Sequence, residues 1–344
     1  MAMTRREAIN DALDRLSGVA FAMGPGFSEH GPMVAEAISS LGRNDHVASW
    51  VEAYKAHYRH NPAPPRRQPI SDAVEADWHE ALGVYTRVSD WLDYFRGRLQ
   101  AAPWQDVLRT WLPRLMDGYA GGLTHGLIRT AHAARAMPDG HASTALERDE
   151  IAHGLAYWAA TYQRPVGDPE RHGPRSLDEA LRDLPRDEGA DIAPALESLE
   201  PVPDIDAAIS RHTATFARLL YAHRELAPVP TIQLIHTITA PSSMRDLLPY
   251  LPPARGAWAY RQLWQVSAAI VARLAKPLAN GDETDPALAA PKLSREELIE
   301  RAVAHRDDHM IKLTDACLRE EAIRPDPVYR ALAEAMLERL PPWQ

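Results

Sequence analysis

The stretch GGLTHGLIRTAHAARA, residues 121–136, holds two histidines seven residues apart in a segment otherwise built from small and aliphatic residues. Seven steps of about 100° return within about 20° of the starting direction, so a helix places His125 and His132 on one face, two turns apart. We predict a helix here with both rings on its buried side. The spacing alone leaves two interpretations open, a pair of hydrogen-bonded core histidines or a pair of metal ligands. The neighbouring Gly121, Gly122 and Gly126 leave room for a bulky centre or substrate, or allow close helix packing.

The same helical period continues on both sides of this stretch, and strand-like alternation is nearly absent. Ser71 is a predicted N-cap, and Ser294 with Glu297 predicts a capping box for a helix running from Arg295 to about Glu320. The β-branched segment TIQLIHTITAP, residues 231–241, fits either a strand or a helix, and we predict helix. Further helices are predicted over residues 1–21, 46–60, 72–82, 103–122, 147–163 and 205–226.

These helices predict an all-α fold, with one large multi-helix domain over residues 1–344 and a buried central site. The segment 165–204 is rich in Pro, Asp and Arg, which predicts a surface loop region with a short helix at residues 176–184. Residues 279–293 form a second predicted connection of the same kind. Neither segment has the composition of a domain linker.

Composition excludes several function classes. The 344 residues carry a formal net charge of −9, which argues against binding of nucleic acid or of anionic membrane surfaces. The single cysteine, Cys317, excludes an intramolecular disulfide and any multi-cysteine metal site. No apolar run reaches the roughly 18–20 residues of a transmembrane helix, and the N-terminus does not read as a signal peptide. We therefore expect a cytoplasmic protein with a small-molecule partner.

The fifteen histidines carry the chemical information, because nucleotide-binding glycine loops and a nucleophile elbow are absent from the sequence. His57, His60, His141 and His172 lie among charged or loop-forming neighbours and are predicted at the surface.

Other histidines lie in apolar surroundings. His30 lies in GFSEHGPM ahead of an apolar helix, and His236 lies between aliphatic residues in LIHTIT. His305, His309 and Lys312 follow at i, i+4 and i+7 near the C-terminus. The charged neighbours of His305 favour a solvated position, and Lys312 either snorkels outward or is buried. For each lone histidine a core role is the more common outcome.

Four motifs, FSEHGPMVAEAISSLG, GGLTHGLIRTAHAARAM, IHTITAPSSMRDLLPYL and HMIKLTDACLRE, occur in the order found in the questin oxidase-like family, which the chain resembles from about His30 to Glu320. That family includes fungal enzymes of secondary metabolism that oxidatively open anthraquinone-type rings. At least one member is understood as a non-haem iron oxygenase whose metal is held by four histidines and a carboxylated lysine. The resemblance thus implies His30, His125, His132, His236 and carboxylated Lys312 as metal ligands.

The resemblance leaves the role of His309 open, as a catalytic residue beside the metal or as the fourth histidine ligand in place of another. Four imidazoles and a carbamate oxygen suit Fe(II), although Mn, Co, Ni or Zn are alternatives. Thr124, Asp308 and Thr314 are candidates for orienting the ligands.

The implied function is an iron(II)-dependent oxygenase that uses O2 to cleave or hydroxylate a hydrophobic aromatic polyketide or phenolic ring. Two alternatives stay open at the level of sequence. The first is an NADPH-dependent Baeyer–Villiger monooxygenase without metal, against which the missing dinucleotide fingerprint counts. The second is a helical metabolite-binding protein without catalytic activity.

Overall fold

The computed structural model describes residues 3–138, 142–185, 189–274 and 287–343. Contacts within the chain divide it into two compact units. Unit 1 comprises Met1–Arg164 and Asp246–Leu251, and unit 2 comprises Pro165–Arg245 and Pro252–Gln344. Each unit is described by itself, and the single domain over residues 1–344 stays a prediction.

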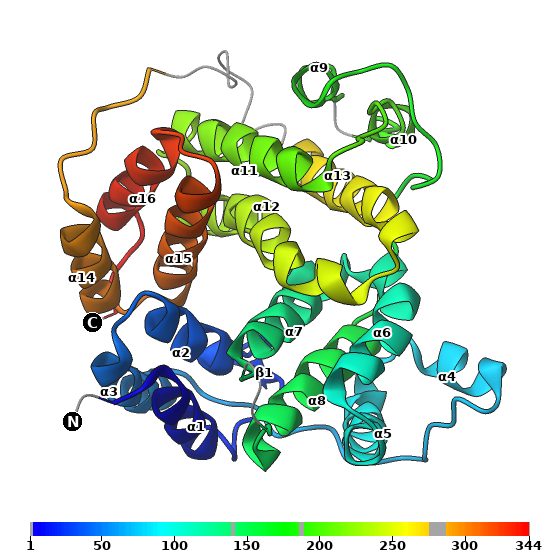
Figure 1. Cartoon of the computed structure of the whole chain (residues 1–344). Coiled ribbons are helices and arrows are strands. Elements are labelled where there is room, and N and C mark those ends of the chain that lie inside the picture. The colour runs from blue at the N-terminus through cyan, green and yellow to red at the C-terminus, as the bar shows by residue number, and fades with distance from the viewer. Residues whose placement is uncertain (1–2, 139–141, 186–188, 275–286, 344) are drawn as a thin grey trace. The chain divides into compact units, whose positions relative to one another are not determined.

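Unit 1 is helical, and α2 packs on α7 while α1 contacts α8 (Figure 1). Helices α1, α2 and α3 also pack on one another, and α8 packs on both α5 and α7. The helices of unit 1 are α1 (Arg5–Arg15), α2 (Gly31–Ser40), α3 (Asn44–His57), α4 (Glu75–Ala81), α5 (Val88–Ala101), α6 (Trp104–Leu115), α7 (His125–Ala136) and α8 (Ala145–Ala160). Short 3-10 turns are η1 (Tyr85–Arg87), η2 (Met116–Gly118), η3 (Gly121–Thr124) and η4 (Leu248–Tyr250).

The strands of the described chain are limited to a small hairpin in unit 1. It consists of β1 (Ala22–Met23) and β2 (Phe27–Ser28), which pair antiparallel just before α2. The all-α prediction is therefore confirmed.

Close packing of α7 on α8 depends on glycine. A Cβ atom added at Gly126 would lie 2.6 Å from the Cα atom of Trp158, and one added at Gly121 would lie 1.5 Å from the carbonyl oxygen of Thr161. The backbones of Trp158 in α8 and of Thr161, the residue that follows α8, fill this space. The interpretation that Gly121 and Gly126 leave room for a bulky centre or substrate is wrong, and close helix packing is their role.

Unit 2 is also helical, and α14, α15 and α16 pack together in Figure 1 while α11 contacts α13 and α16. Its helices are α9 (Leu177–Arg182), α10 (Ala193–Leu196), α11 (Ile205–Ala222), α12 (Pro228–Leu247, whose last two residues belong to unit 1), α13 (Gly256–Arg273), α14 (Arg295–His305), α15 (Asp308–Ile323) and α16 (Val328–Arg339), with the 3-10 turn η5 (Pro253–Arg255).

The predicted helix from Arg295 to about Glu320 is two helices. It begins as predicted with the Ser294–Glu297 capping box, but Arg306 adopts a left-handed backbone (φ 68°) and ends α14. The side chain of Asp307 then caps α15 by accepting a hydrogen bond from the Met310 N–H at 2.8 Å. His305 and His309 therefore do not share one continuous helix.

The β-branched segment around His236 forms helix α12, as predicted. The hydroxyls of two of its threonines hydrogen-bond within the helix: Thr237 Oγ1 donates to the Leu234 carbonyl at 2.6 Å, and Thr239 Oγ1 donates to the Ile235 carbonyl at 3.2 Å. The predicted cap at Ser71 is wrong, since α4 begins only at Glu75.

The segment 165–204 contains α9, which agrees with the predicted short helix and carries a Ser176–Glu179 capping box, and also α10. Of the predicted connection 279–293, residues 279–286 lie outside the described residues. Within the described chain, every helix is too short or too polar to span a bilayer.

Replacing Gly126 with alanine tests the packing of α7 on α8. The added Cβ overlaps the Trp158 backbone, so we expect the free energy of unfolding to fall by about 1–3 kcal/mol. Gly97 is the matched control, because it lies exposed in α5 with no atom within 4 Å of its added Cβ. There the same substitution should stabilise by up to about 1 kcal/mol through helix propensity. Urea denaturation followed by circular dichroism measures both, and equal effects would contradict the packing argument.

Candidate metal centre

His30 and His125 lie face to face in unit 1. Their Nε2 atoms are 2.6 Å apart, and their rings stack with centroids 4.7 Å apart at 13°. The Nδ1 atom of His125 lies 2.6 Å from the carbonyl oxygen of Gly122. A carbonyl only accepts, so Nδ1 of His125 carries the proton and its Nε2 presents a lone pair toward His30.

A strained turn places the Gly122 carbonyl against His125. Gly122, Leu123 and Thr124 all have positive φ values, of 58°, 51° and 68°, directly before α7. For Leu123 and Thr124 this left-handed conformation costs roughly 1–2 kcal/mol each. Backbone strain of this kind gathers at functional sites, where the surrounding fold enforces it. Thr124 Oγ1 is buried without a hydrogen-bond partner among the described residues.

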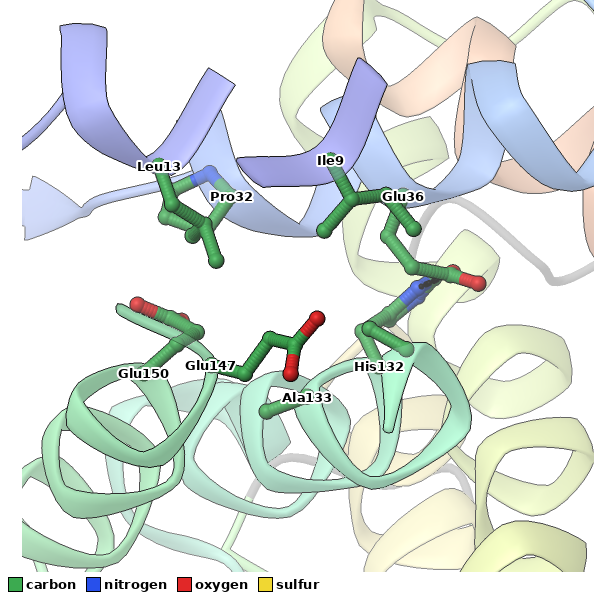
Figure 2. Close-up of a pocket in the computed structure, with 9 residues that line it drawn as sticks. Ile9, Leu13, Pro32, Glu36, His132, Ala133, Glu147 and Glu150 are labelled. Carbon is green, nitrogen blue, oxygen red and sulfur yellow. Dashed lines mark hydrogen bonds and ion pairs between the residues drawn. The ribbon is translucent and has the colours of Figure 1, made fainter. Parts of the chain in front are cut away.

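His132 is held by a carboxylate. Its Nδ1 atom lies 2.7 Å from Oε2 of Glu36, a buried residue of α2. Figure 2 shows the Glu36 side chain reaching from α2 toward His132 on α7, beside a small pocket that Ile9 and Leu13 of α1 also line. The carboxylate accepts the Nδ1 proton, so Nε2 of His132 also keeps a free lone pair.

The predicted histidines of unit 2 lie on two helices. Nδ1 of His236 lies 2.7 Å from the carbonyl oxygen of Ile232, one turn earlier in α12, which again leaves Nε2 as the acceptor. The ring of His309 in α15 is 5.7 Å from that of His236, at 65°. Nδ1 of His309 lies 3.2 Å from Oδ1 of Asp308. Asp307, Asp308 and His309 offer ligand atoms within 4.8 Å of one another.

Lys312 is buried one turn after His309. Its side chain is 3% exposed, so it does not snorkel outward. Its ammonium makes no hydrogen bond within the described part of the chain. Burial lowers the pKa of Lys312 to about 8, while Asp308 and Asp307 oppose this shift. Thr314, a predicted orienting group, instead donates to the Met310 carbonyl at 2.9 Å.

The protonation of the ring nitrogens in these histidines suits binding of a metal ion. In His125, His132 and His236 the Nδ1 proton is held by a fixed carbonyl or carboxylate, which is the usual arrangement of metal-ligating histidines. Neighbouring nitrogen ligands at about 2.1 Å from an octahedral ion are about 3 Å apart. The Nε2 atoms of His30 and His125 approach this separation, and two lone pairs so close repel unless a proton or a cation lies between them.

Sequence reasoning missed the carboxylates that hold this site. Glu29 is buried beside His30 and accepts hydrogen bonds from Tyr54 Oη at 2.5 Å and the Gly31 N–H at 3.0 Å. Tyr54 Oη in turn accepts from the His30 N–H at 2.9 Å. Glu29 and Glu36 both lie in the motif around His30. Glu36 is a charged residue within the apolar helix 31–40, and this pattern indicates a buried carboxylate with a partner.

The histidines predicted at the surface divide into three outcomes. His57 and His172 are exposed, as predicted. His60 is half-buried and its Nδ1 lies 2.9 Å from Glu29, so its prediction was wrong. His141 lies outside the described residues. His305 is partly exposed, and its Nε2 donates to the Leu340 carbonyl at 3.0 Å.

The predicted ligands are distributed over both units. His30, His125 and His132 belong to unit 1, whereas His236 and Lys312 belong to unit 2 together with His309. Within the units, His30 lies against His125, and His236 lies near His309. That the five side chains bind one metal ion stays a prediction.

His212 shows how a core histidine differs from these residues. It is fully buried in α11, stacks on Phe216 and has its Nε2 3.1 Å from Ser267 Oγ. Burial lowers the pKa of His212 from 6.5 to about 3. It is therefore a neutral part of the core of unit 2.

Acid should destabilise the fold through His212. Between pH 6.5 and 3 the unfolded chain binds a proton that the folded chain excludes, so stability falls as the pH drops through this window. His212→Gln removes this titration. We expect the slope of the free energy of unfolding against pH to become shallower by up to about 1.4 kcal/mol per pH unit. Urea denaturation at several pH values measures this slope, and an unchanged slope would contradict the buried neutral state.

Comparison with known proteins gives a family match. The model of a family described as questin oxidase-like matches residues 27–201, about half of the chain. No curated protein matches the chain. The family match includes His30, Glu36, His125 and His132, and ends before His236 and Lys312.

Proposed function

We propose a metal-dependent oxygenase function for this chain, which belongs to the questin oxidase-like family. Membership suggests an oxygenase that acts on aromatic polyketides. The finer proposal is that the enzyme is a non-haem iron(II) oxygenase. It uses O2 to cleave a hydrophobic phenolic or hydroquinone-like ring without NADPH, both oxygen atoms entering the product, or to hydroxylate such a ring with a hydroquinone supplying the two electrons that reduce the second oxygen atom to water.

The shared state of the buried histidines carries this proposal. His125, His132 and His236 each have Nδ1 against a fixed acceptor and Nε2 left as a donor of electrons. Ligation requires this tautomer, because only a deprotonated nitrogen binds the ion. His153, which is not a proposed ligand, has the same tautomer through the Asp149 carbonyl at 2.8 Å, so the tautomer counts here together with the 2.6 Å approach of the His30 and His125 Nε2 atoms.

The proposed ligands are His30, His125, His132, His236 and Lys312. Bound to them, Fe(II) supplies a redox centre and an open position for O2 or substrate. Mn, Co, Ni and Zn also bind imidazole, so the metal is identified by analysis of the purified protein.

Lys312 enters this ligand set as a carbamate. The neutral amine attacks CO2 at carbon, forms an N–C bond and releases one proton, which leaves an anionic oxygen ligand. An ammonium cannot bind a cation, so carboxylation is necessary for this role. The burial of Lys312 favours the neutral amine and supports the proposal.

His309 is proposed to act beside the metal. Asp308, 3.2 Å from Nδ1, orients the ring and favours the proton on that nitrogen. In this role Nε2 accepts the proton of a phenolic hydroxyl, which raises the electron density of the ring that O2 attacks.

Metal content separates the proposed ligands from other histidines. We expect the wild-type chain to bind about one equivalent of metal, and His125→Ala and Lys312→Ala each to lose most of it. His57→Ala is the matched control, because His57 is exposed. His309→Ala should keep the metal and lose activity. Mass spectrometry of the metal in proteins purified from iron-supplemented cells measures all four variants.

Two outcomes would overturn these assignments. Equal metal content in the His125, Lys312 and His57 variants would refute the ligand set. Loss of metal in His309→Ala would make His309 a ligand instead of a catalytic residue.

The source of the oxygen atoms tests the reaction class. In a dioxygenation both atoms of O2 enter the product and no external reductant is consumed. With 1,8-dihydroxyanthraquinone or 1,4-naphthohydroquinone as probes and ¹⁸O2 as oxidant, we expect a product that carries two ¹⁸O atoms without added NADPH. Removal of the metal with a chelator should abolish the reaction. Activity that survives chelation and requires NADPH would refute the proposal in favour of a metal-free monooxygenase.

A further inference from the structure

Glu36 is a buried carboxylate on which three helices converge. It is 2% exposed in α2 and accepts hydrogen bonds from side chains of α1, α2 and α7. We infer that Glu36 is the positioning residue of the metal centre, which fixes the His132 ring for ligation. This inference rests on the proposed function, because it needs a metal that His132 binds.

The two oxygen atoms of Glu36 divide the donors between them. Oε1 accepts from Arg5 Nη2 at 2.5 Å and from Ser40 Oγ at 2.8 Å. Oε2 accepts from His132 Nδ1 at 2.7 Å and from the Nη2 of Arg135. Nε of Arg135 lies 3.0 Å from both oxygens. The carboxylate is therefore saturated with donors and has one fixed orientation.

The charge of Glu36 is also fixed. Nη2 of Arg5 and the Nε and Nη2 atoms of Arg135 place two positive charges against its oxygen atoms, which favours the ionised carboxylate. An ionised carboxylate accepts only, so the His132 proton is confined to Nδ1. Nη2 of Arg135 lies 3.2 Å from the same Nδ1. Both nitrogens are donors, and they lie close together because both donate to Oε2 of Glu36.

The contact with Glu36 prepares Nε2 of His132 for binding a metal ion. A histidine whose Nδ1–H is held by a carboxylate has its tautomer and ring orientation set before the metal arrives, and its Nε2 is more basic. Loss of such a partner typically weakens metal binding 10–100-fold. In this inference Glu36 acts through its contact with His132 and is not itself a ligand of the metal.

A purely structural role is the competing explanation, because Arg5 and Arg135 also join α1 to α7 around Glu36. Nη2 of Arg5 donates to the Arg135 carbonyl at 3.0 Å. Glu150 of α8 provides a matched control. It is buried in the same unit and binds Arg129 of α7 at 2.6 and 2.9 Å, but it contacts no proposed ligand.

Two substitutions of Glu36 separate charge from position. Glu36→Asp keeps the charge and withdraws the carboxylate by about one C–C bond. The long arginine side chains can follow it, while the short His132 side chain on a rigid helix cannot. Glu36→Gln keeps the length and removes the charge. If the glutamine variant fails to fold, the aspartate variant still tests the inference.

Titration of metal-free protein with Co(II), followed by absorbance and calorimetry, measures the effect. We expect Glu36→Asp and Glu36→Gln to bind Co(II) 10–100-fold more weakly than wild type, and Glu150→Asp and Glu150→Gln to stay within about threefold. Proton NMR of the Co(II)-loaded wild type should show an exchangeable, hyperfine-shifted His132 Nδ1–H signal, assigned by its absence in His132→Ala. This signal should be lost to exchange with water in the Glu36 variants.

The outcomes that overturn the inference are distinct. Wild-type affinity in both Glu36 variants, with weak binding in His132→Ala, refutes the role of Glu36 and leaves the proposed function standing. Equal weakening in the Glu150 variants shows a general effect of destabilising unit 1 and also refutes it. If the wild-type protein binds no Co(II), both the inference and the metal-dependent function fall.

Discussion

The fixed Nδ1 proton is the constraint on which the candidate metal centre depends. A buried imidazole has two nitrogens, and which one keeps its lone pair is decided by the acceptor that the fold places against the other. In His125 and His236 that acceptor is a backbone carbonyl of the same turn, whereas in His132 it is the carboxylate of Glu36 from another helix. The Ile232 carbonyl follows from helix geometry and the Gly122 carbonyl from the turn before α7, but the carboxylate requires α2 to pack on α7.

Packing of α7 therefore matters to the chemistry as well as to stability. Gly126 lets α7 approach the Trp158 backbone of α8. The left-handed turn at Leu123 and Thr124, directly before α7, points the carbonyl oxygen of Gly122 toward His125. The strain of this turn, on the order of 2–4 kcal/mol for two non-glycine residues, must be offset by the burial of α7. Nearly all of α7 is buried, which makes that compensation available.

Features that depend on short-range pattern could be predicted from the sequence. The helix over residues 125–136, the capping box at Ser294 and the helical fate of residues 231–241 depend on neighbours within one or two turns, and the structure agrees with them. Residues 121–124, predicted in the same helix, instead form a 3-10 turn with left-handed residues. The break at Arg306 could not be predicted, because a left-handed arginine leaves the hydrophobic period on both sides intact. Ser71 failed as a cap for the related reason that a capping residue is also common in turns, and its Oγ accepts from the Ala73 N–H instead.

The candidate site shows the same division between local and distant information. Motif resemblance indicated which histidines to examine, but no local pattern connects Glu36 to His132, 96 residues later in the chain. A glutamate in an apolar helix costs several kcal/mol unless it is paired, so its presence in α2 demanded a partner whose identity only the fold supplies. Glu36 differs from an ordinary buried ion pair, because its partners include a predicted metal ligand as well as two arginines. Arg129 and Glu150 form an ion pair with two hydrogen bonds, whereas Glu36 accepts from Ser40 and from the proposed ligand His132 in addition to its two arginines.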